Sequence, residues 1–106
     1  MSIYSTLFYS ADAPNGLTAA YTVPAGATVV VRDIEAYNSN ASATAFSISR
    51  QVSGTTLSYI WVPSPALSAS SWAQWHGRAV LNAADVLEVS TAAAGVYLHI
   101  SGYLLS

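Results

Sequence analysis

The chain has 106 residues, of which 53% are hydrophobic and only 8% are charged, and its formal net charge is −2. This length fits a single domain spanning residues 1–106, and the absence of cysteine excludes disulfides and thiolate metal sites. Because it has three basic residues, no apolar run of about 20 residues and no signal-peptide pattern, we expect no nucleic-acid partner, no membrane insertion and no export from the cytoplasm in which it is made.

Apolar and polar residues alternate with a period of two along most of the chain, which is typical of β-strands. Residues that favour turns, such as Pro, Gly, Asn and Asp, separate the alternating runs. The runs predict strands at 3–9, 19–23, 29–37, 45–51, 57–62, 72–76, 78–81, 86–90 and 96–105. Eight or nine short strands at this spacing predict an all-β fold, an antiparallel β-sandwich that is jelly-roll-like.

Some residues carry local predictions. Gly77 breaks or bends the chain between 72–76 and 78–81, and Gly102 marks a bulge or the close approach of another backbone. The stretch 65–75 is the one that could hold a turn of helix. The segments 23–31 (VPAGATVVV) and 81–89 (LNAADVLEV) share a form, which indicates the same corner made twice in a two-sheet fold.

The residues that could carry chemistry form no catalytic pattern. Asp33 and Glu35 lie two apart on a predicted strand and share a face, where they could contact an arginine. His76 and His99 lack metal-binding spacing, and no serine lies in a Gly-x-Ser-x-Gly turn. We therefore expect no catalytic residues, no metal, no cofactor and no enzymatic activity.

The stretch "SSWAQWHGRAV" places two tryptophans three residues apart. On a strand, Trp72 and Trp75 point to opposite sides, so one indole ring is left on the outer face. Aromatic residues stand on both faces of several other predicted strands, which exceeds what one small monomer can bury. We expect the surplus to be buried between copies of the chain, and the candidate interface residues are Tyr59, Trp61, Trp72, Trp75 and Tyr103.

Two quoted segments carry a resemblance to a known class of proteins. "YTVPAGATVVVRDIEAYN" and "WAQWHGRAVLNAADVLEVSTAAAGVYLHISGYLLS" resemble small virion proteins of tailed bacteriophages, particularly those of actinobacterial hosts. The resemblance covers about residues 21–106, and Ala84 departs from the glycine usual in the second turn. It implies a structural component of the particle on the capsid exterior, the neck or the tail, with no catalytic residues to carry over.

The leading hypothesis is a non-enzymatic virion protein, assembled in the host cytoplasm, that decorates or reinforces the capsid as an oligomer. Its partners would be copies of itself and the major capsid protein or other virion proteins. Residues 1–17 are expected to form a strand or an arm that engages a neighbouring subunit. Two alternative functions remain open. The first alternative is a virion protein associated with the neck or the tail. The second alternative is a carbohydrate-binding module that binds host-surface glycans through exposed Trp and Tyr rings, with polar groups such as Gln74 or Asn40 beside them.

Overall fold

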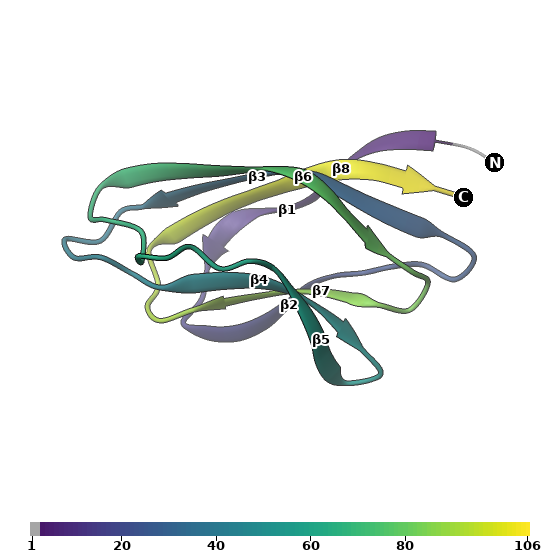
Figure 1. The fold of residues 1–106 in the computed structure, drawn as a ribbon, viewed down its shortest axis with the longest axis horizontal. Coiled ribbons are helices and arrows are strands. Elements are labelled where there is room, and N and C mark those ends of the chain that lie inside the picture. The colour runs from purple at the N-terminus through teal and green to yellow at the C-terminus, as the bar shows by residue number, and fades with distance from the viewer. Residues whose placement is uncertain (1–2) are drawn as a thin grey trace.

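The computed structural model describes residues 3–106, which form eight β-strands and no helix. The strands pack as two layers, one above the other in Figure 1, so the predicted all-β sandwich is confirmed. The strands are β1 (Ile3–Ala13), β2 (Gly16–Thr22), β3 (Thr28–Asn38), β4 (Phe46–Val52), β5 (Thr55–Trp61), β6 (Ser71–Leu81), β7 (Val86–Thr91) and β8 (Val96–Leu105).

Each layer is a four-stranded antiparallel sheet. The first sheet has the order β1-β8-β3-β6 and the second sheet has the order β2-β7-β4-β5. The pairs β1·β8, β2·β7, β3·β6 and β4·β5 are nested, as if one long hairpin with its tip at Ser53 and Gly54 had been rolled into two layers. This nesting gives the jelly-roll-like arrangement. The edge strands are β1 and β6 in the first sheet and β2 and β5 in the second sheet.

The core lies between the two sheets and consists of branched aliphatic side chains with a few aromatic rings. Alternation along the strands supplies it: Val96, Leu98 and Ile100 of β8 point inward, as do Phe46 and Ile48 of β4. The largest fully buried aliphatic residues are Val23, Val29, Val31, Ile34, Ile48, Leu81, Leu87, Val89, Val96, Leu98 and Ile100.

The strand β6 runs without interruption from Ser71 to Leu81, so of the two outcomes predicted for Gly77, a break or a bend, the structure shows the bend. The register with β3 shifts at this point, which marks a bulge. A Cβ at Gly77 would lie 2.7 Å from Cζ2 of Trp75, so the missing side chain makes room for the indole ring. The stretch 65–75, which could have held a turn of helix, contains none in the structure.

Gly102 lies where the backbone of another strand approaches closely, as predicted. A Cβ there would collide with the carbonyl oxygen of Val30 on the paired strand β3. The first strand, β1, pairs with β8 of the same chain from Ile3–Leu105 to Ala13–Val96, so residues 3–13 form a strand of this domain. Met1 and Ser2, part of the expected arm, lie outside the described residues, and engagement of a neighbouring subunit stays a prediction.

The two corners predicted to be equivalent are equivalent. In each, the chain crosses between the sheets through a turn closed by a backbone hydrogen bond, from Ala27 N to Pro24 O and from Asp85 N to Asn82 O. The third residue of each turn has positive φ, 75° at Gly26 and 70° at Ala84, which is the geometry of a type II turn. The corners also bond to each other, since Val23 N donates to Asp85 O and Ala84 N donates to Val23 O.

Candidate interaction surfaces

Charged side chains are distributed unequally between the two outer faces, meaning the sides of the sheets turned away from the core. Within residues 3–106, every exposed Asp, Glu or Arg belongs to the first sheet: Asp12, Arg32, Asp33, Glu35 and Arg78. Of the three other charged residues, Asp85 and Glu88 are buried, and Arg50, whose side chain is 24% exposed, pairs with Asp85 at 2.8 Å. The described outer face of the second sheet therefore has no exposed charge.

An aromatic row crosses the first sheet at the end where β8 begins. Tyr37 of β3 lies directly opposite Tyr97 of β8 and Trp72 of β6, so the three rings share the outer face. The Tyr37 and Trp72 rings are 4.6 Å apart between centroids and tilted by 42°. Trp72 is 70% exposed and Tyr97 is 48% exposed. The two tryptophans do point to opposite sides, since Trp75 packs against the core cluster.

The next rows of the same face are polar. Glu35 lies between His99 and Gln74, and Asp33 lies between Ser101 and His76 in the row beyond. The His76 Nδ1 atom lies 2.6 Å from Oδ1 of Asp33, so this carboxylate pairs with a histidine rather than with an arginine. No group of three or more potential metal ligands occurs among the residues that the structure describes.

The second sheet buries a carboxylate on its outer side, and the hydrogen-bond partners that the described residues supply to it are neutral. Glu88 of β7 is 1% exposed. Its Oε2 accepts a hydrogen bond from Gln51 Nε2 at 2.7 Å, and its Oε1 accepts bonds from Thr56 Oγ1 at 3.0 Å and Ser49 Oγ at 3.4 Å. The sequence pattern gave no sign of this, because Ser49 and Glu88 alternate like solvent-facing positions and are covered only by the pairing of β4, β5 and β7.

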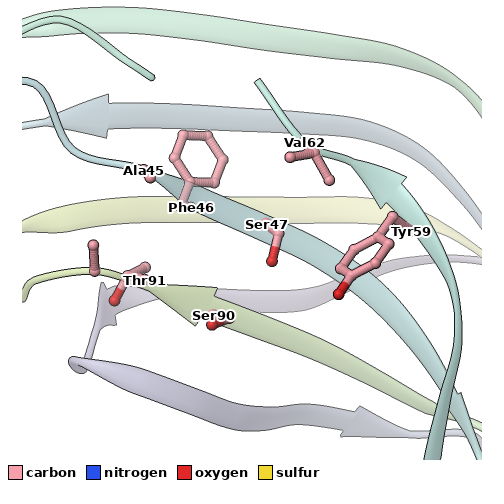
Figure 2. A pocket seen from close by; sticks show the side chains of 8 residues that line it. Ala45, Phe46, Ser47, Tyr59, Val62, Ser90 and Thr91 are labelled. Atoms are coloured by element: carbon pink, nitrogen blue, oxygen red, sulfur yellow. The ribbon is translucent and has the colours of Figure 1, made fainter. Parts of the chain in front are cut away.

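A hollow of about 590 Å³ opens beside these strands on the second sheet. Figure 2 shows Ser47, Tyr59 and Ser90 on the outer side of the sheet, whereas Phe46 points to the opposite side, into the sandwich. The lining is mostly apolar and contains no charged side chain. It consists of Ala45, Phe46, Ser47, Tyr59, Val62, Ser90, Thr91 and Ala92.

The structure separates the five predicted interface residues into two groups. Tyr59, Trp72 and Tyr103 are exposed, the first on the second sheet and the other two on the first sheet. Trp61 and Trp75 are half-buried against the core. The Trp61 and Phe46 rings meet edge to face, with their centroids 5.1 Å apart. Contact of any of the five with a neighbouring subunit stays a prediction.

The loops at the end near the aromatic row are fixed by amide side chains. The buried Asn38 donates from Nδ2 to the carbonyl oxygens of Ser42 and Leu67, both at 3.0 Å. Asn40 donates to Ala94 O at 2.9 Å and to Thr44 Oγ1 at 3.1 Å. Asn40 was expected to stand beside exposed rings as a polar group for glycans, but its amide is used to brace loops. Gln74, by contrast, is exposed beside the aromatic row.

No family model and no curated protein matches the chain. Its fold is similar to that of a phage capsid protein. One solved structure, described as a pentameric capsid protein isolated from metagenomic phage sequences, matches with a TM-score of 0.52 and 21% identity over 88% of this chain. A second structure of the same description has a TM-score of 0.49 and 20% identity over 92% of this chain. This chain spans 59% of the length of each solved chain, and the likeness shows the fold alone.

Proposed function

We propose that this protein is a non-enzymatic structural protein of a tailed-phage particle, in which copies of the chain associate and decorate or reinforce the capsid. The likeness to a pentameric capsid protein supports both the particle and the self-association. It also favours the capsid over the neck and the tail. No catalytic arrangement is part of the proposal, because the histidine–carboxylate pair that the described residues form, His76 with Asp33, is open to solvent.

The observation that carries this proposal is the outer face of the second sheet, on which the described residues expose no charge. Charged residues are depleted at the centres of protein interfaces, and a surface without charges has little electrostatic protection against self-association. The hollow under Tyr59 gives this face an apolar depression into which a side chain of a second copy can pack. Tyr59 itself is 65% exposed and is the predicted anchor that belongs to this face.

The substitution Tyr59→Glu tests the association. We expect native mass spectrometry to show that the wild-type chain is oligomeric at micromolar concentration. In the variant, the dissociation constant of the oligomer should rise by about 30-fold, because an interface anchor worth about 2 kcal/mol is lost. Because Tyr59 is exposed, the thermal transition of the folded subunit should hardly move.

Leu7→Glu is the matched control, since Leu7 is 53% exposed on the first sheet and the same charge is introduced there. A wild-type chain that stays monomeric at micromolar concentration would contradict self-association. Dissociation by Leu7→Glu but not by Tyr59→Glu would place the interface on the other sheet.

Labelling with gold-conjugated antibody tests the location. We expect label over the heads of purified tailed-phage particles that contain this chain. Label confined to the neck or tail would overturn the capsid assignment, and particles purified to constant composition without the chain would overturn the structural role.

A further inference from the structure

The aromatic row of the first sheet borders a shallow hollow of about 270 Å³, which we call the aromatic hollow. Two of the rings that line it, Trp72 and Tyr97, are exposed, and the Tyr37 ring packs against the Trp72 ring with centroids 4.6 Å apart. The volume lies just below the range of pockets that hold drug-sized ligands, about 300–1,000 Å³, so it suits one or two small rings. The lining consists of Ser10, Ala11, Glu35, Tyr37, Trp72, Tyr97, Leu98 and His99.

Polar groups stand along one side of these rings. Glu35 lies two residues before Tyr37 on β3, and His99 lies two residues after Tyr97 on β8. Because these strands are antiparallel, both residues lie on the same side of the aromatic row, about 7 Å from it along the strands. Ser10 pairs with His99 and Gln74 pairs with Glu35, which extends this polar row across the sheet. A ligand lying on the rings therefore meets carboxylate, imidazole, amide and hydroxyl groups along its edge.

We infer that the aromatic hollow binds a sugar unit of a neutral glycan. A pyranose has an apolar face of C–H bonds, which packs on the electron-rich face of an indole or phenol ring, and a rim of hydroxyls that need donors and acceptors. The hollow offers both in the required order, with rings in one row and polar groups in the next.

The charges of the hollow determine which glycans it accepts. Glu35 is the one carboxylic acid among its lining residues, and Asp12 stands beside Tyr97 in the paired strand. The exposed guanidinium groups of Arg32 and Arg78 lie beyond the Asp33 row, on the far side of the polar centre of the sheet. An acidic sugar would meet the carboxyl group of Glu35 with no arginine or lysine in the lining to offset it, so the hollow favours neutral sugars.

A protein partner would be a poorer fit here. Protein interfaces exclude charge from their centres, whereas this hollow has a carboxylate in its lining and lies on the face that carries all the exposed charges. The proposal is independent of self-association through the second sheet. Either can fail alone, because sugar binding and subunit mass are measured separately.

Intrinsic tryptophan fluorescence tests the inference with the full chain. Glucose, galactose, N-acetylglucosamine and their β-1,4-linked disaccharides serve as neutral probes, and glucuronic acid and N-acetylneuraminic acid serve as acidic ones. We expect saturable quenching or a spectral shift by at least one neutral probe, with a dissociation constant of about 1 mM, and no saturation by the acidic probes. Trp72 reports the event, because it is the tryptophan that stands open to solvent.

Trp72→Ala should weaken binding of the neutral probe by about tenfold or more in isothermal calorimetry, and Glu35→Gln should weaken it and let acidic sugars bind. Val80→Ala is the control, since Val80 is exposed on the same face of β6 at the opposite end and should leave binding unchanged. Absence of saturable binding by every neutral probe overturns the inference. So does a Trp72→Ala variant that binds sugar like wild type, or one whose only change is in subunit mass, because the row would then be a protein contact.

Discussion

Replacing Ala84 with glycine should stabilise this protein. Ala84 is the third residue of a type II turn and has φ of 70°, a left-handed conformation that costs a residue with a Cβ about 1–2 kcal/mol. Glycine removes this cost but loses about 0.4–1 kcal/mol through the greater freedom of the unfolded chain. The difference leaves a gain of about 0.5–1 kcal/mol in the free energy of unfolding.

The equivalent turn of the other corner supports the argument, because glycine already occupies that position as Gly26, with φ of 75°. For a domain of this size, a gain of about 0.5–1 kcal/mol corresponds to a rise of about 2–8 °C in Tm. Thermal unfolding followed by circular dichroism, together with urea titration at 25 °C, measures both quantities.

Ala83→Gly provides the matched control one residue away. Ala83 is exposed like Ala84 but does not have positive φ, so glycine there brings the entropic loss without relief of strain. We expect that variant to lose about 0.4–1 kcal/mol. If Ala84→Gly is destabilised as much as Ala83→Gly, the turn does not hold Ala84 in a left-handed conformation and the reasoning is refuted.

The remaining predictions concern two buried residues and the hairpin tip, and each is measured as the midpoint of unfolding in urea. Gly102→Ala should cost about 2 kcal/mol or more, because its Cβ would collide with Val30 O and force β3 and β8 apart; a cost below about 0.5 kcal/mol would mean that the strands yield freely. Glu88→Gln should cost about 1–2 kcal/mol through weaker hydrogen bonds to its neutral donors, whereas an exposed control such as Glu35→Gln should change stability by less than about 0.5 kcal/mol. Ser53→Asn should stabilise the hairpin by a few tenths of a kcal/mol, because Ser53 and Gly54 both have positive φ in a two-residue loop, where Asn-Gly is favoured; a lower midpoint would contradict this.

Alternation in the sequence was sufficient to predict most of the fold. The runs around Ile48 and Leu98 alternate cleanly, and both became strands with the expected residues facing the core. The corner shared by 23–31 and 81–89 was also recognisable, because a small-residue turn before a valine-rich strand depends only on local conformation. Strand ends were less predictable, since β1 and β2 extend into the expected turn as far as Ala13 and Gly16 under the control of their partner strands.

The candidate surfaces could be predicted only in part. The opposite orientation of Trp72 and Trp75 follows from strand geometry, but the covering of Trp61 by Phe46 depends on a contact between strands that no local pattern reveals. The concentration of exposed charges on one face is likewise invisible in the sequence. Asp12, Glu35 and Arg78 come from three strands whose order in the sheet has to be known before they can be assigned to the same side.

The pairing of Ile3 with Leu105 brings the two ends of the described chain side by side at one end of the molecule, as Figure 1 shows. Tyr97 of the aromatic row lies eight residues earlier on β8, about 25 Å away along the strand. A fluorescent tag or an enzyme fused to either terminus would therefore emerge at the same pole and leave the opposite pole unobstructed. Such fusions would leave the rings at the other end accessible.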